Sequence, residues 1–169
     1  MVYMIENYYK KRKRFYDYVA GFIDGEASFT ISVKKEPTTR FGYAIDPEFK
    51  VSQLKSKIKV LEFVKQAIGC GTITEKSGQE NMAVLVVKNR KLIIEKVIPF
   101  FRKHKLIVKE EEFNRFAKVV FALENKTHQT EKGFIEILKL VFQGFSDENR
   151  KYKFEEIVTT MKRPSETIR

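Results

Sequence analysis

The sequence contains a single cysteine, Cys70, and only two histidines, His104 and His128, among its 169 residues. One cysteine cannot form an intramolecular disulfide or a cysteine-based zinc site, which favours a reducing compartment. Two histidines nearly exclude a histidine-rich metal site and leave little basis for a histidine-dependent catalytic triad. Any metal-dependent chemistry must therefore use oxygen ligands.

The chain also lacks the roughly 18 consecutive apolar residues that a membrane-spanning helix needs. Its amino end lacks the charged, apolar and small-residue segments of a secretory signal peptide. We therefore expect an intracellular protein, in a prokaryotic cytoplasm or in an organelle or nucleus, with no membrane partner. A composition of 43% hydrophobic and 33% charged residues, over 169 residues, predicts one globular domain with a sizeable core.

Acidic residues are too few to balance the basic ones, since 33 lysines and arginines accompany 22 aspartates and glutamates. The formal net charge of +11 indicates a polyanionic partner, and nucleic acid is the commonest. Five of the cations are consecutive and should stay solvated: Lys10, Lys11, Arg12, Lys13 and Arg14. We interpret residues 1–14 as a basic N-terminal arm that is either frayed or reaches phosphate groups.

A helix is predicted directly after this arm, because apolar residues recur there with helical period: Phe15, Tyr18, Val19, Phe22 and Ile23. The opposite stripe of the helix lacks long polar side chains and consists of Asp17, Ala20, Gly21 and Asp24. Gly21 costs about 1 kcal/mol of helix propensity relative to alanine. Since small residues let another backbone approach closely, we expect this stripe to contact a second helix.

The hydropathy period then changes to two, which is typical of strands with one buried face. One strand is expected from Ser28 to about Lys34, and another ends at about Ser52 after a start or bulge at Pro47. A hairpin is expected at 72–76 and 82–87, with its loop at 77–81. One helix should end at Gly69, and another should open at Asn89 and be ended or kinked by Pro99.

The order helix, strand, strand, helix, strand, strand, helix predicts an α+β fold, in which helices cover one face of a four-stranded sheet. This domain is placed at residues 15–146, and residues 147–169 are interpreted as a polar C-terminal extension. The other sheet face should present hydroxyl and charged side chains: Ser28, Thr30, Ser32, Lys34, Glu48, Lys50, Thr72, Thr74 and Lys76. Such a face suits the DNA major groove, and an ordinary solvated sheet face is the alternative.

Carboxylates concentrate where the first helix meets the first strand, in Asp24-Gly25-Glu26. An exposed acidic pair is weak evidence for a site by itself. If the small-residue stripe packs against its own copy, however, two copies of Asp24 and Glu26 converge. Such a cluster repels itself unless cations hold it, and carboxylate oxygens are suitable ligands for Mg²⁺.

Residues 19–29, Val-Ala-Gly-Phe-Ile-Asp-Gly-Glu-Ala-Ser-Phe, closely resemble the signature of the LAGLIDADG homing endonucleases. The order of elements over residues 15–145 is similar to that family's core, an αββαββα fold with a saddle-shaped antiparallel sheet. The departures from the signature include Val19 for its first leucine, Ala27 for its final glycine and Glu26 for its second aspartate. The last change lengthens the acidic ligand by one methylene, and glutamate remains an acceptable Mg²⁺ ligand.

The resemblance implies a site-specific DNA endonuclease that acts on a long, pseudo-palindromic duplex and leaves staggered 3′ overhangs. One signature per chain implies a homodimer. The family's acidic metal ligand falls on Glu26 and its backbone-carbonyl ligand on Gly25. Its other active-site positions fall on Gln53, Lys57 and Lys109, with Lys105 as the rival for the last. Mg²⁺ is the implied cofactor, with Mn²⁺ or Ca²⁺ as substitutes and Ca²⁺ not supporting cleavage.

Two other functions stay open at this point. An intron-RNA maturase on the same fold would bind a structured intron RNA as well as it binds DNA. A non-catalytic DNA-binding regulator would keep the fold without using the acidic site. We favour the nuclease because Glu26, Gln53 and Lys109 occur together, whereas a retired site is free to lose any of them.

Overall fold

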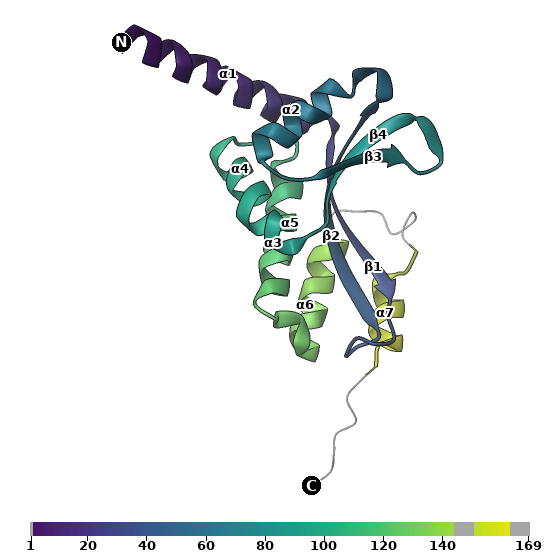
Figure 1. The fold of residues 1–169 in the computed structure, drawn as a ribbon. Helices are drawn as coiled ribbons and strands as arrows, with labels where there is room; N and C mark the ends of the chain where they lie inside the picture. Colours follow the sequence, from purple (N-terminus) through teal and green to yellow (C-terminus); the bar gives the residue numbers. More distant parts are fainter. Residues whose placement is uncertain (1, 144–150, 163–169) are drawn as a thin grey trace. The chain divides into compact units, whose positions relative to one another are not determined.

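The computed structural model describes residues 2–143 and 151–162, with side chains from residue 11 onward. Its helices and strands, shown in Figure 1, are α1 (Val2–Glu26), β1 (Ala27–Lys35), β2 (Tyr43–Leu54), α2 (Lys59–Ile68), β3 (Thr72–Lys76), β4 (Gln79–Val87), α3 (Arg90–Leu92), α4 (Ile98–Lys103), α5 (Glu110–Glu124), α6 (Glu131–Phe142) and α7 (Phe154–Thr160). The four strands form one antiparallel sheet in the order β1-β2-β4-β3, backed by helices. This confirms the predicted α+β class. Among the described helices, none is both long and apolar enough to span a membrane.

Helix α1 differs from the predicted helix at its start and in its buried face. It begins at Val2, so the basic stretch at 10–14 is helical rather than frayed, with residues 11–14 exposed. Val19, Ala20 and Ile23 are buried, whereas Tyr18 is 57% exposed. Positions i, i+1 and i+4 share one face of a helix, and Tyr18 lies on the opposite side. The prediction that Ala20 lies on the open stripe, and Tyr18 on the buried one, is therefore wrong.

One compact unit of the chain combines residues up to Thr30 with Glu48–Asn114. Within it β4 pairs with β2 and β3, so that Val51, Leu85 and Ile73 lie side by side across the strands. Four phenylalanine rings pack together near this sheet, with centroids 5.3–5.7 Å apart: Phe29, Phe49, Phe101 and Phe113. These rings join β1, β2, α4 and α5 in a common core.

Three local predictions differ from the structure in whole or in part. Strand β2 begins at Tyr43, so the expected start at Pro47 is wrong. Strand β4 begins at Gln79, so the hairpin turn contains only Ser77 and Gly78, whose φ of +74° suits glycine in a two-residue turn. The helix that opens at Asn89 does not end at Pro99. A π-helical segment at Ile93–Val97 precedes it, and such a widened turn accommodates the missing N–H of proline.

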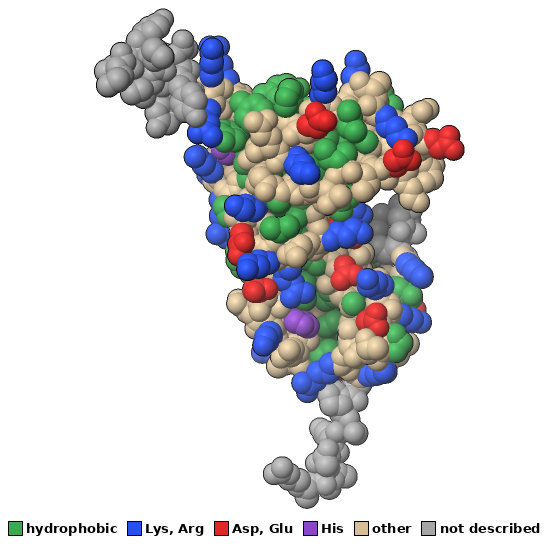
Figure 2. All heavy atoms as spheres, in the orientation of Figure 1, with side chains coloured by type: hydrophobic (Ala, Val, Ile, Leu, Met, Phe, Trp, Pro, Cys, Tyr) green, Lys and Arg blue, Asp and Glu red, His purple; other side chains and the backbone are tan. Residues whose placement is uncertain are grey.

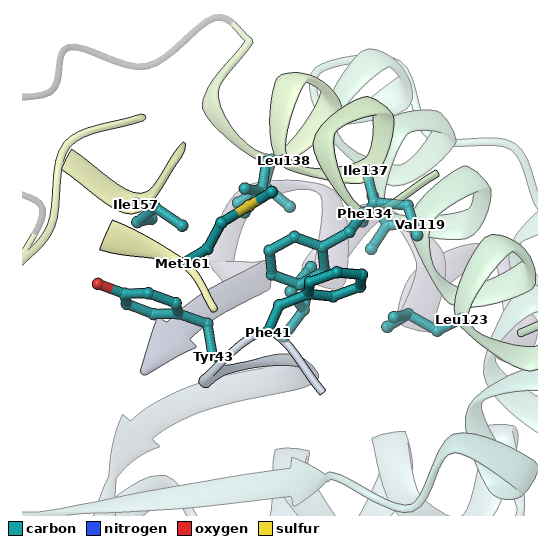
Figure 3. Close-up of a cluster of buried hydrophobic side chains, with 11 residues drawn as sticks. Phe41, Tyr43, Val119, Leu123, Phe134, Ile137, Leu138, Ile157 and Met161 are labelled. Atoms are coloured by element: carbon teal, nitrogen blue, oxygen red, sulfur yellow. The ribbon is translucent and has the colours of Figure 1, made fainter. Parts of the chain in front are cut away.

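The second compact unit combines Ile31–Pro47 with the chain after Asn114. Its core, drawn in Figure 3, packs Phe41 and Tyr43 against residues of α5 and α6 and against Ile157 and Met161. The Tyr43 hydroxyl also lies 2.7 Å from the Thr160 hydroxyl. Residues 154–161 of the predicted polar C-terminal extension therefore contribute Ile157 and Met161 to a hydrophobic core, a contact that the sequence analysis did not predict. The expected boundary at 146–147 lies outside the described residues.

One carboxylate fastens the end of α1 to the segment that precedes α5. Oδ2 of Asp24 accepts hydrogen bonds from the backbone N–H groups of Ile107 (2.9 Å) and Val108 (3.0 Å), and Oδ1 accepts one from Lys109 (2.9 Å). Burial raises the pKa of Asp24, but these three hydrogen bonds and the Lys109 charge outweigh it and hold the pKa below its ordinary value. The Asp24 carboxylate therefore stabilises the contact between α1 and the segment before α5, and it is not open to an external ligand.

A second acidic side chain anchors the start of β1. Oε1 of Glu112, in the first turn of α5, accepts a hydrogen bond from the backbone N–H of Phe29 at 2.9 Å. Asp24 and Glu112 thus hold both sides of the short stretch that contains Gly25 and Glu26. The junction between α1 and β1 is fixed to the start of α5.

Substitution of Asp24 by asparagine tests how much these hydrogen bonds stabilise the fold. The amide removes the charge and one acceptor, so we expect the free energy of unfolding at pH 7 to fall by about 1–2 kcal/mol. Because the folded pKa is lowered, the contribution of Asp24 is complete above the ordinary value of 3.8 and is lost as pH falls through the folded pKa. The difference between wild type and D24N should therefore narrow below pH 3.8, as measured by urea unfolding.

The matched control is Glu62→Gln, which neutralises an exposed acid on α2. This control should change the free energy of unfolding by less than about 0.5 kcal/mol. Equal stabilities of D24N and the control at pH 7 would contradict the stabilising role of Asp24.

Candidate active site and nucleic-acid interface

Glu26 is the last residue of α1, and its side chain is exposed. Within the described residues its carboxylate makes no hydrogen bond or ion pair. The last carbonyl groups of a helix have no helical partner, and together they carry a partial negative charge that favours cations. Gly25 is exposed beside Glu26, and a Cβ placed there would meet no atom within 4 Å. The end of α1 therefore offers a carboxylate and a backbone carbonyl to a cation.

These donors fit a hard divalent cation, because Mg²⁺ binds oxygen ligands and keeps several waters. One chain, however, supplies few of them. Among the described residues there is no group of three acidic, histidine or cysteine side chains that holds a metal by itself. The remaining ligands have to come from water, from a phosphate or from a second copy of the chain.

Lys109 is held close to this helix end. Its backbone N–H donates to Asp24, two positions before Glu26, and its ammonium charge helps to lower the pKa of that carboxyl. Lys109 is half-buried and Lys105 is exposed. The contact with Asp24 favours Lys109 over Lys105 as the lysine of the predicted site.

Gln53 lies near the end of β2, and Lys57 lies in the 3₁₀ turn that follows this strand. The side chain of Gln53 is half-buried, and its Oε1 accepts a hydrogen bond from the next backbone N–H, that of Leu54, at 2.8 Å. Lys57 is exposed at the end of the 3₁₀ turn Lys55–Lys57. Among the described residues, no hydrogen bond or ion pair links either side chain to Glu26. Their part in the site stays a prediction.

The exposed stripe of α1 is composed differently from the predicted one. Asp17 and Gly21 are exposed as expected, but Ala20 is buried and Asp24 is occupied within the chain. A Cβ added at Gly21 would meet nothing within 4 Å. The chain's own packing therefore does not require glycine at position 21.

Apolar side chains accompany this glycine stripe. Tyr18 is exposed on α1, and Ile107 and Val108 are 87% and 79% exposed on the segment that Asp24 fastens to the same helix. Exposed apolar side chains near one helix are a feature of contact surfaces, so we interpret these residues as a candidate contact surface. We call Tyr18, Gly21, Gly25, Ile107 and Val108 the α1 contact face.

The polar face of the sheet carries most of the predicted side chains. Burial alternates along β1 and β2, so the predicted residues there are all partly or fully exposed while their neighbours are mostly more buried. Ser28 and Thr30 hydroxyls lie 2.7 Å apart, and Lys34 pairs with Asp46 at 2.5 Å. On β3, Thr72 and Thr74 are exposed. Lys76 follows a register shift at Glu75, so the alternation that predicted its direction stops there.

A charged cluster of Glu48, Lys50 and Lys88 lies on this face, and Lys88 was not among the predicted residues. Glu48 forms ion pairs with Lys50 and, at 3.3 Å, with Lys88. Burial raises the pKa of Glu48, but hydrogen bonds and charge from the two lysines outweigh it, and the pKa is lowered. Lys88 was missed because it directly follows β4. Continued alternation from Val84 and Val86 would have placed it on the same face.

Cations are numerous across the molecular surface. Figure 2 shows lysine and arginine side chains spread over the face in view, with acidic side chains between them. The distribution agrees with the formal charge of +11 and suits a polyanionic partner.

Comparison with known proteins addresses the family directly. Residues 19–120 match the family model described as LAGLIDADG endonuclease. The chain is 40% identical over 116 residues to DNA endonuclease I-CeuI of Chlamydomonas moewusii, covering 66% of this chain and 53% of that protein. It is 36% identical over 137 residues to homing endonuclease I-ApeII of Aeropyrum pernix, covering 80% of this chain and 81% of the relative.

Solved structures give the same result. An I-CeuI structure, described as complexed with DNA, superposes with a TM-score of 0.80 at 30% identity, covering 87% of this chain and 75% of that one. The archaeal endonuclease I-Vdi141I, also complexed with DNA, gives 0.81 at 31% identity, covering 88% and 95%. Since the family model matches more than half of the sequence and these folds agree, the chain belongs to the LAGLIDADG endonuclease family.

Proposed function

We propose that this protein is a site-specific, divalent-metal-dependent DNA endonuclease that acts as a homodimer on a long, pseudo-palindromic duplex. The observation that carries the proposal is the exposed Glu26 at the end of α1, beside a glycine stripe that the chain's own packing leaves open. The relatives named DNA endonuclease and homing endonuclease, and the neighbours solved with DNA, support the same reaction and substrate.

Phosphodiester hydrolysis needs an attacking water, neutralised charge at the phosphate and help for the leaving oxygen. A bound Mg²⁺ supplies charge neutralisation and lowers the pKa of its water. In this chain the Glu26 carboxylate and the Gly25 carbonyl would hold the ion, and Mn²⁺ would suit the same oxygen donors. Ca²⁺ would bind them without supporting cleavage.

The other predicted residues act on the water and the phosphate. The Gln53 amide, which can donate and accept hydrogen bonds, would orient water near the end of β2. The Lys57 and Lys109 ammonium groups would offset the charge that develops at the phosphate. The hydrogen bond from the Lys109 backbone N–H to Asp24, near the end of α1, supports this role for Lys109.

A homodimer would bring one Glu26 to each DNA strand. The α1 contact face is the surface proposed for this pairing, because its glycines leave room for a second helix backbone. Two sites related by a two-fold axis would cut the strands at staggered positions and leave 3′ overhangs. The polar sheet face of each chain would then lie in the major groove of one half-site.

Glu26→Gln tests the catalytic assignment. Glutamine keeps the size of the side chain and removes the charge that a metal ligand needs. We expect Mg²⁺-dependent cleavage of a cognate duplex to fall at least about 100-fold, since even changes around metal ligands cost 10–100-fold, while DNA affinity changes little. Duplex nicking and gel shift measure the two effects.

Glu26→Asp is the matched variant, because it restores the acid of the family signature and should keep measurable cleavage. Parental cleavage by E26Q would remove Glu26 from the site. Cleavage by neither wild type nor E26D, with DNA binding intact, would support a non-catalytic regulator. Equal affinity for structured intron RNA and duplex DNA would support a maturase.

Gly21→Leu tests the dimer. Because a Cβ at position 21 meets no atom within 4 Å in the part of the chain that the structure describes, leucine should leave the monomer folded and block a second helix. Analytical ultracentrifugation should show a shift from dimer to monomer, with loss of double-strand cleavage. Glu62→Leu, at an exposed position of α2, adds the same side chain elsewhere and should remain dimeric. A dimeric G21L protein would show that α1 does not form the interface.

A further inference from the structure

Strand β4 carries valines on both of its faces. Ala83, Leu85 and Val87 are at most 2% exposed and face the core. Val84 and Val86 alternate with them and therefore lie on the polar face of the sheet. Val84 is 8% exposed and Val86 is half-buried. An apolar seam thus runs through a face whose other side chains are mainly hydroxyls and charges.

The strand register places polar side chains on both sides of this seam. Lys50 on β2 and Thr72 on β3 lie directly opposite Val86, one on each side. Ser52 and Thr74 flank Val84 in the next row. Each row therefore presents a donor or hydroxyl, a methyl-bearing side chain and a second hydroxyl.

Val86 is half-buried, so part of its side chain is accessible. It lines a hollow of about 650 Å³ with Thr72, Thr74 and Lys88, and the hollow extends past the strand end to Val87 and Leu92. Lys50 and Lys88 supply positive charge around the seam, and both pair with Glu48. An apolar side chain with cations beside it matches the edge of a base in a polyanionic duplex.

We propose that Val86 reads the 5-methyl group of a thymine in the DNA major groove. This inference rests on the proposed function, because it assumes that the polar sheet face binds DNA. Thymine alone presents a methyl group in that groove, beside the O4 acceptor, and apolar side chains contact it. Lys50 and Thr72 lie on either side, where they can donate to neighbouring acceptors. Val86 thus selects thymine over cytosine at one position of each half-site.

The test removes methyl groups from each partner in turn. Duplexes that bind the protein are first selected from a randomised library, and each thymine of the selected site is then replaced by uracil, which lacks only the methyl. We expect wild-type affinity to fall about fourfold at one thymine per half-site, as expected for burial of one methyl group. In the variant Val86→Ser, which carries no methyl group, uracil at that position should cost less than twofold.

Val60→Ser is the matched control, since it makes the same change at a half-buried valine on α2, outside the sheet. It should keep the uracil penalty. Val86→Asn provides a second variant without a methyl group if V86S is unfolded by circular dichroism. A uniform response of V86S and wild type to uracil at every thymine would overturn the assignment while leaving DNA binding established. Failure to select any duplex would overturn the proposed function itself, and the assignment with it.

Discussion

The candidate site depends on a single carboxylate that accepts three backbone hydrogen bonds. Asp24 joins the end of α1 to Ile107, Val108 and Lys109. These residues are 83–85 positions later in the sequence and lie just before helix α5. This contact brings Lys109 to the helix end and presents Ile107 and Val108 beside α1. It also explains how two acids so close in sequence differ in role. The Asp24 carboxylate is occupied by hydrogen bonds within the chain, whereas the Glu26 carboxylate is exposed and can bind a ligand.

The glycines of α1 show a related division between stability and function. Glycine in a helix interior lowers stability by roughly 0.5–1 kcal/mol relative to alanine. At Gly21 and Gly25 no neighbouring atom of the described residues would obstruct a Cβ, so these residues gain no packing in return for the lost stability. A second helix backbone that approaches this stripe would supply the compensation. Open space at a glycine is therefore informative about contacts that lie outside the chain.

The sequence predicted those features that local patterns determine. The order of elements and the α+β class follow from hydropathy periods, and Gly69 ends α2 with a φ of +80° as its residue type suggests. The partners of Asp24 could not be predicted, because a carboxylate at a helix end gives no sign of which distant amides it meets. Helix formation through the basic stretch at 10–14 was not predicted. Repulsion among five consecutive cations opposes a helix there, whereas the high helix propensity of lysine and arginine favours it.

Strand β4 was predicted incompletely for a different physical reason. Alternating hydropathy identifies the two faces of a strand only where one face is polar, and β4 has valine on both. Only the register with Lys50 and Thr72 shows that Val86 belongs to the polar face. Glu48 lies on the same face: an acid on the surface proposed to bind DNA repels phosphate, yet it orients two lysines and lowers the entropy that they would lose on binding. Both features are therefore suited to reading bases and poorly suited to holding the backbone.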